Sequence, residues 1–206
     1  AMRDVGVRRV VFTSSGAVYG SQKKQPLSED LRPHPDSPYA VSKLSAEYYV
    51  RTIGKLWDIE TVTLRIFNAY GQGQHLPPAH PPVIPNYLKQ AVQEGTLVIH
   101  NSGDQTRDFV YVDDVVRAMS RAASADEVDG EIINVGSGTE VSVTDLADLV
   151  LEVTDGEPEV VHNPKSDGGV KRMRADITRA RELLDYEPQI SLREGLRLTL
   201  KRDPRL

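Results

Sequence analysis

The sequence contains no cysteine, so neither a disulfide framework nor a cysteine-based zinc site can form. It also has no apolar run near the roughly 18 residues of a membrane span, and its first residues lack the apolar core of a secretory signal. The formal net charge of -5 provides no basic excess of the kind that nucleic acids and anionic membranes require. These absences favour a cytoplasmic protein that binds neither nucleic acid nor membrane.

Two further absences concern metals and glycine. The five histidines show no ligand spacing such as H-E-x-x-H, so no metal site is expected. The 15 glycines do not form the G-x-G-x-x-G turn with which a dinucleotide-binding fold opens. Residues 71–73 and 136–138 come nearest, and neither G-x-G has a third glycine in register. The sequence therefore resembles one that begins in the middle of a domain.

The first third of the chain alternates between strand and helix patterns. Residues 10–13 form a short β-branched and aromatic run, which predicts a buried strand. Ser37 and Pro38 are typical of a helix start, and apolar residues recur at helical spacing up to about Lys55. Residues 61–67 alternate as a strand does. Strand, helix and strand in this order predict a parallel α/β sheet.

The remainder of the chain opens with a loop rich in proline and glycine, at residues 71–85. We expect strands at residues 97–99 and 131–135. We expect a helix over residues 85–93, and another that starts at Asp113 and Asp114, whose negative charges are favourable in a first turn. A capping box at Ser142 predicts a third helix. Two more helices are expected from Asp176 to Leu184 and from Ser191 onward.

Tyr39 and Lys43 stand four residues apart, so they project from one face of the expected helix. A free tyrosine, with a pKa near ~10, is a poor base, but a neighbouring ammonium favours the phenolate. Such a pair can take a proton from a sugar hydroxyl. Chance spacing remains the alternative, because the chain has 8 tyrosines.

Ser15 follows the first expected strand, at the sheet edge where ligands bind in open α/β folds. A hydroxyl at this edge can relay a proton. The alternative is a turn serine that hydrogen-bonds only to its own backbone.

Four ordered blocks carry a family resemblance: V-F-T-S-S-G-A-V-Y-G at residues 11–20, S-P-Y-A-V-S-K at 37–43, L-R-I-F-N-A-Y-G at 64–71 and R-D-F-V-Y-V-D-D-V at 107–115. Together with N-V-G-S-G at 134–138 and A-D-I-T at 175–178, they resemble the extended short-chain dehydrogenase/reductases, in particular the NAD-dependent epimerase/dehydratase family. The resemblance covers nearly the whole chain.

The resemblance implies a role for each matching residue near the cofactor. Tyr39 would be the catalytic base, and Lys43 would hold the nicotinamide ribose and tune the tyrosine. Ser15 would help to move the proton. Phe67 would lie near the nicotinamide, and Ser14 would also contact the cofactor.

The same resemblance assigns residues to the sugar nucleotide. Asn68 would bond to its phosphates, and Val83 would line the nucleotide site. Arg107 would pair with the pyrophosphate, a suitable partner for a forked cation. From the residues alone, a salt bridge between Arg107 and Asp108 or Asp104 is the alternative.

The implied fold is a partial Rossmann-like parallel sheet with a smaller C-terminal α/β substrate-binding region. Residues 1–70 would form the second half of the NAD-binding domain. Residues 71–206 would mainly bind the sugar nucleotide, with residues 131–138 returning to the Rossmann sheet. The front βα units that bind most of NAD have no counterpart in the sequence, so we expect a fragment that binds NAD poorly alone.

The implied reaction is a transient oxidation at sugar C4 by NAD, most simply in a UDP-hexose 4-epimerase. Gly16 and Ala17 stand where dehydratases of this kind carry Asp-Glu, which favours an epimerase over a dehydratase or decarboxylase. A diphosphate-binding arginine expected ten residues before Asp176 falls on Ser166, and Lys165 or Lys171 would be its substitute. The alternatives are a non-catalytic truncated module that binds a sugar nucleotide, or a dehydratase or decarboxylase.

Relatives dimerise through the helix that carries Tyr39, so a homodimer or a missing N-terminal part is the expected partner.

Overall fold

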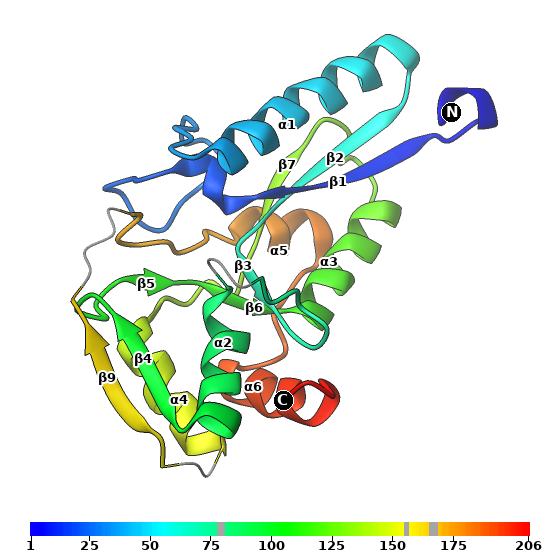
Figure 1. The fold of residues 1–206 in the computed structure, drawn as a ribbon. Coiled ribbons are helices and arrows are strands. Elements are labelled where there is room, and N and C mark those ends of the chain that lie inside the picture. The colour runs from blue at the N-terminus through cyan, green and yellow to red at the C-terminus, as the bar shows by residue number, and fades with distance from the viewer. Residues whose placement is uncertain (78–80, 155–156, 165–168) are drawn as a thin grey trace.

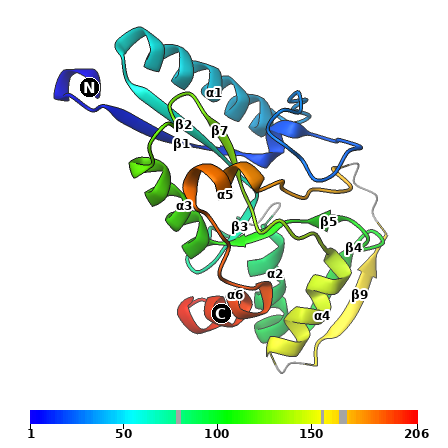
Figure 2. The same cartoon turned by 180° about the vertical axis from the view of Figure 1, so that it is seen from behind.

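The computed structural model describes residues 1–77, 81–154, 157–164 and 169–206, which form a mixed α/β structure. Three parallel strands make the first sheet, in the order β1 (Arg9–Ser15), β2 (Glu60–Ile66) and β7 (Ile132–Val135). Helix α1 (Pro38–Trp57) connects β1 to β2. Figures 1 and 2 show α1 on one face of this sheet, with α3 (Val112–Ser124) and α5 (Thr178–Leu184) on the other. The parallel α/β class predicted from the sequence is confirmed.

A second group of elements lies beyond the carboxyl ends of these strands (Figure 1). It contains the helices α2 (Val83–Lys89), α4 (Val143–Thr154) and α6 (Leu192–Arg202), and the parallel pair β4 (Thr96–His100) and β9 (Glu159–Asn163). The short pairs are parallel β3 (Asn68–Tyr70) with β6 (Phe109–Tyr111), and antiparallel β5 (Thr106–Arg107) with β8 (Val141–Ser142). Short 3-10 turns span Arg3–Val5 and Gly16–Tyr19, and a π-helical turn, Gln90–Glu94, follows α2.

Helix α1 begins and ends for reasons that are visible in the sequence. The Ser37 hydroxyl accepts a hydrogen bond from the amide of Ala40 at 3.2 Å, and Pro38 occupies the first turn, where its missing N–H costs nothing. The helix ends at Trp57, and the next residue, Asp58, adopts a left-handed conformation with φ of 53°. The predicted helix start is therefore confirmed, and the helix runs two residues beyond the predicted end.

Two helix starts differ from the predictions. Helix α2 begins at Val83 rather than at Pro85, because a proline is tolerated anywhere in the first turn. Helix α5 begins at Thr178, and its N-cap is Ile177. The Asp176 carboxylate still accepts a hydrogen bond from the Thr178 amide at 3.1 Å, so the predicted capping group acts from one position earlier.

Three apolar clusters hold these elements together. One fills the space between the first sheet and α3 and α5, and another fills the second group of elements around Tyr70, Leu97 and Leu146. A third, smaller cluster brings residues that follow β1 and β2 together with residues from 173–177. It consists of Val18, Tyr19, Leu27, Phe67, Met173, Ala175 and Ile177. Two of its members, Phe67 and Met173, also line the site described below.

Asp108 clamps the turn that follows β7. Its buried carboxylate accepts hydrogen bonds from the Ser137 amide and hydroxyl at 2.6 and 2.7 Å, and from the amides of Gly138 and Ala175 at 3.0 Å each. Gly136 lies within this clamp, where a Cβ atom would stand 2.7 Å from the Ala175 Cβ and 2.9 Å from the Asp108 Oδ2. The clamp therefore requires glycine at position 136.

Replacing Gly136 by alanine is expected to lower the free energy of unfolding by about 1–3 kcal/mol, because the added methyl overpacks a rigid site. Urea denaturation followed by circular dichroism measures the change. Gly169→Ala is the matched control, since a Cβ there meets no atom of the described residues within 4 Å; its effect should stay within about 0.5 kcal/mol. Equal effects of the two substitutions would contradict the close packing around Gly136.

Candidate functional site

A cavity of about 460 Å³ opens at the carboxyl ends of β1 and β2, beside the first turns of α1. It is lined by Thr13, Ser14, Ser15, Ala17, Tyr39, Lys43, Ile66, Phe67, Asn68, Ala69 and Met173. Six residues singled out from the sequence therefore share one cavity, although they come from three separate segments. We call it the proton-transfer cavity.

Tyr39 and Lys43 lie on the same face of α1, as their spacing predicts. The Lys43 ammonium donates a hydrogen bond to the Thr13 carbonyl oxygen at 3.0 Å and lies 5.9 Å from the centre of the Tyr39 ring. The tyrosine itself is 55% exposed, so a ligand can reach its hydroxyl. The ammonium is thus held near the Tyr39 ring, on the same face of α1.

Ser15 forms the turn hydrogen bond of one interpretation, and the proton relay of the other stays a prediction. Its hydroxyl oxygen accepts a hydrogen bond from the Ala17 amide at 3.2 Å, as a turn serine does. A hydroxyl also carries one donor hydrogen, which this bond does not use. Because Ser15 lines the cavity, that hydrogen is available to a ligand.

Ser14 lines the cavity, but its hydroxyl hydrogen is bonded inside the protein. Its hydroxyl donates a hydrogen bond to the Glu47 carboxylate at 2.5 Å, in a buried position. The bond uses the one donor hydrogen of this hydroxyl, and a contact between Ser14 and a cofactor stays a prediction.

A second cavity, of about 210 Å³, contains the three residues expected to bind the sugar nucleotide: Asn68, Val83 and Arg107. Asn68 and Ala69 line both cavities, which makes the two spaces neighbours. A ligand with a sugar beside Tyr39 could place its phosphates past Asn68 in this second space. The structure thus brings together residues that are almost 40 positions apart in the sequence.

Arg107 is a partly buried cation. Its Nη1 donates to the Thr106 carbonyl oxygen at 2.7 Å, and no acidic group of the described residues lies within ion-pair distance of it. The ion pair with Asp108 or Asp104 that the sequence left open is absent, because Asp108 is occupied by the clamp. Burial lowers the pKa of the Arg107 guanidinium. Such a cation is suited to bind an anion, and bidentate phosphate recognition is typical of arginine.

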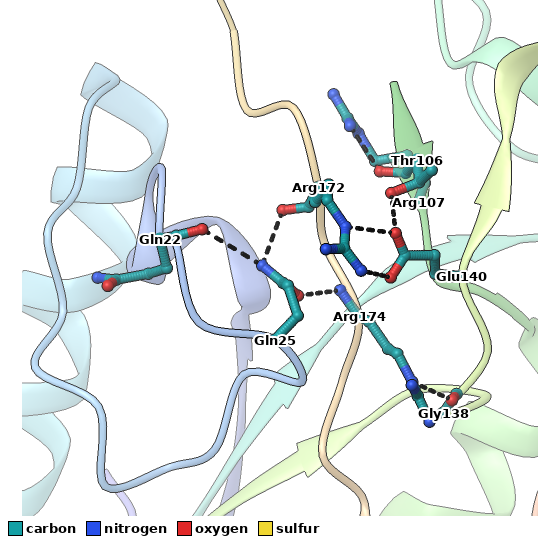
Figure 3. Close-up of polar contacts among 8 residues, drawn as sticks. All are labelled: Gln22, Gln25, Thr106, Arg107, Gly138, Glu140, Arg172 and Arg174. Carbon is teal, nitrogen blue, oxygen red and sulfur yellow. Dashed lines mark hydrogen bonds and ion pairs between the residues drawn. The ribbon is translucent and has the colours of Figure 1, made fainter. Parts of the chain in front are cut away.

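Residues 169–177, which we call the strap, lie across the boundary between the two groups of elements. Gln25 accepts a hydrogen bond from the Arg174 amide at 2.9 Å and donates one to the Arg172 carbonyl oxygen at 3.2 Å. On the other side, Arg172 forms a two-bond ion pair with Glu140, at 2.7 Å for each bond. Figure 3 shows the strap between these partners, with the Arg107 side chain extending away from Glu140.

The strap contributes to two spaces. Met173 lines the proton-transfer cavity, and its sulfur lies 4.0 Å from the Asn68 side-chain nitrogen. Lys171 and Arg172 line a larger cavity of about 1080 Å³ together with Arg107. Ser166, which stands where a diphosphate-binding arginine was expected, and Lys165, one of its two candidate substitutes, lie outside the described residues. Of the two candidate lysines, Lys171 lies within the described residues, where it lines the same cavity as Arg107.

The strap should loosen in acid. Hydrogen bonds from Arg172 hold the pKa of Glu140 below its ordinary value of about 4.3. Because the folded pKa is the lower one, the stabilisation is present above the ordinary pKa and is lost as the pH falls through the folded value. Methyl NMR of Met173 should show a transition below about pH 4. Glu140→Gln should remove that transition, and an unchanged wild-type signal would contradict the link.

Three residues at the site were not singled out from the sequence. Met173 and Arg172 come from a segment whose partners lie more than 30 positions away, so no local pattern marks them. Glu47 is different, because it follows Lys43 by four positions and lies on the same helix face.

No group of three or more acidic residues or histidines that could hold a metal ion occurs in the described ranges. No helix within those ranges is long and apolar enough to cross a bilayer.

A parallel sheet gathers a serine, a tyrosine and a lysine around one cavity at its carboxyl edge, an arrangement that is chemically suited to proton transfer. Residues 1–136 match the model of the NAD dependent epimerase/dehydratase family, and the chain belongs to this family. It is 37% identical over 98% of its length to a UDP-glucose 4-epimerase of Mycolicibacterium smegmatis, and 36% identical over 95% to a putative UDP-glucose 4-epimerase of Methanocaldococcus jannaschii. It spans 64% and 63% of these two proteins.

Solved structures agree in fold. A Thermotoga maritima UDP-glucose 4-epimerase with UDP-glucose superposes with a TM-score of 0.90 at 35% identity, over 98% of this chain and 65% of that one. A Bacillus cereus UDP-glucuronic acid 4-epimerase, in complex with UDP-glucuronic acid and NAD, gives 0.88 at 32% identity, over 98% and 63%. The family and fold expected from the sequence are confirmed.

Proposed function

We propose that this chain carries the proton-transfer site and the sugar-nucleotide site of an NAD-dependent UDP-hexose 4-epimerase. The observation that carries the proposal is the proton-transfer cavity, which holds Ser15, Tyr39 and Lys43 beside Asn68. The named relatives that act on UDP-glucose and UDP-glucuronate support the substrate class. The proposal places the protein in carbohydrate metabolism and in the cytoplasm.

In this proposal Tyr39 takes the proton from the sugar hydroxyl at C4, and the Ser15 hydroxyl donates to the same oxygen and assists the transfer. The fixed ammonium of Lys43 stabilises the phenolate before the proton arrives. Arg107 and Asn68 hold the diphosphate, which orients the sugar toward Tyr39. When the hydroxyl reforms on the opposite face, the tyrosine returns its proton.

The residues around Lys43 fit a nicotinamide nucleotide. An ammonium has three donors, and the bond to Thr13 uses only one of them. Two donors therefore remain for the ribose hydroxyls, and Phe67 lines the same cavity for the ring. When NAD is bound, it supplies the hydride acceptor and donor of the reaction. The Gly-rich turn that holds the rest of a dinucleotide has no counterpart in the sequence.

The lining of the cavity favours epimerisation over elimination or decarboxylation. No acidic side chain is among the described residues that line it, and Ala17 occupies the stretch where a dehydratase would place its acid. Elimination of water needs a general acid at the leaving hydroxyl. Inversion at C4 needs only the tyrosine, the serine and the cofactor.

A non-catalytic module that binds sugar nucleotides is the second candidate, and the absent Gly-rich turn favours it. We also propose that the outer face of α1 contacts a second copy or a preceding segment. Tyr48, Tyr49 and Leu56 are exposed on that helix, which supports such a contact.

Incubation with UDP-glucose and NAD+, followed by proton NMR of the sugar, tests the proposal. UDP-glucuronate and UDP-N-acetylglucosamine serve as parallel substrates. We expect inversion at C4 with no net change in NAD. Release of carbon dioxide would instead indicate a decarboxylase, and release of water a dehydratase. Binding of both ligands without turnover would favour the non-catalytic module.

A further inference from the structure

Helix α1 carries a third polar residue on the face that bears Tyr39 and Lys43. Glu47 follows Lys43 by one turn and is only 3% exposed, which is rare for a carboxylate. It does not line the proton-transfer cavity. The proposed proton transfer therefore does not use it directly.

Glu47 joins α1 to two strands at once. Its Oε1 accepts hydrogen bonds from the Ser14 hydroxyl at 2.5 Å and from the Arg65 Nε at 3.0 Å, and its Oε2 accepts one from the Arg65 Nη2 at 2.8 Å. One turn earlier, Lys43 bonds to the Thr13 carbonyl oxygen. The helix is thus fixed at two consecutive turns to the residues immediately before Ser15.

The network continues beneath the site. The Arg65 guanidinium lies 4.8 Å from the centre of the Tyr19 ring, and the Tyr19 hydroxyl donates to the Asn134 side-chain oxygen at 2.8 Å. Asn134 in turn donates to the Leu27 carbonyl oxygen at 2.8 Å. These groups are buried, so the contacts link α1, β2 and β7 through the interior.

A buried ion pair is a poor source of stability, because apolar residues of similar size often serve as well. What a directional pair adds is a defined position for the groups that it joins. We infer that Glu47 is a positioning residue that holds the Tyr39 and Lys43 face of α1 in register with Ser15. This inference rests on the proposed function of that site.

Tyrosine-ring NMR tests the inference without any turnover. The Tyr39 signal is assigned with Tyr39→Phe, and Lys43→Met then reports how strongly the ammonium acts on that ring. In the Glu47→Met/Arg65→Met background, which keeps the interior apolar and packed, we expect the shift caused by Lys43→Met to fall by at least half. An equal shift in both backgrounds would overturn the positioning role.

Controls separate the alternatives. Lys89→Met removes a remote ammonium and should leave the Tyr39 signal unchanged in both backgrounds. If the double variant fails to fold, Ser14→Ala replaces it, because it removes one link and keeps the ion pair; an undiminished Lys43→Met shift there would overturn the inference. Titration with UDP-glucose is run separately, so a failure to bind counts against the proposed function and leaves the NMR comparison valid.

Discussion

Replacing Glu47 by methionine is expected to lower the free energy of unfolding by about 3–5 kcal/mol, because it leaves a buried cation without its partner. The Arg65 side chain is 3% exposed, and two of its three nitrogens donate to Glu47. Its Nη1 has no hydrogen-bond partner among the described residues, even in the intact pair. Urea denaturation monitored by circular dichroism measures the loss.

The double variant Glu47→Met/Arg65→Met is the matched control for that prediction. Removing both charges leaves no unpaired cation, so its stability should return to within about 1.5 kcal/mol of the wild type. Lys89→Gln, which breaks an exposed pair with Glu94, should change stability by less than about 1 kcal/mol. A loss of less than about 1 kcal/mol for Glu47→Met would show that the ion pair with Arg65 does not hold α1 on the sheet.

Replacing Tyr39 by phenylalanine is expected to reduce the rate of C4 inversion by about 10²–10⁴-fold with NAD bound, because the general base is lost. Affinity for UDP-glucose should stay nearly constant, since the phenol is half exposed and the phosphates are held elsewhere. The measurement is the initial rate and the KM, with binding followed by calorimetry.

Tyr48→Phe is the control for the general base. Tyr48 lies on the same helix and is 63% exposed, outside both cavities, so its substitution should leave the rate unchanged. If Tyr39→Phe kept more than a tenth of the wild-type rate, another group would have to accept the proton.

Local patterns in the sequence predicted the parts of the site that are local in the chain. The spacing of Tyr39 and Lys43 fixes their common helix face, and the strand ending at Ser15 fixes its edge of the sheet. Asn68, Val83 and Arg107 were identified through the family resemblance, and the structure places them in one cavity. Arg107 could not be assigned from its neighbours, because burial and the clamp on Asp108 decide its partners.

The other parts of the site and of the fold depend on contacts between segments that are distant in the sequence. The strap, with Met173 and Arg172, reaches the site from the end of the chain, and hydrophobic periodicity carries no information about such contacts. The strands β3, β5, β6 and β8 have only two or three residues each, too few for a period to appear. Ser14 was assigned through the family resemblance, and its hydroxyl donates a hydrogen bond to the buried Glu47 carboxylate on α1.

Calorimetric titration of the 206-residue chain with UDP-glucose, and separately with NAD+, tests the central claim most directly. The account predicts that UDP-glucose binds and that Arg107→Met weakens this binding by roughly 10–100-fold, because one charge-assisted phosphate contact is lost. It predicts weaker binding of NAD+, for which the chain offers only the part of the site around Lys43. A folded chain that does not bind UDP-glucose, or binds it equally well without Arg107, would contradict the account.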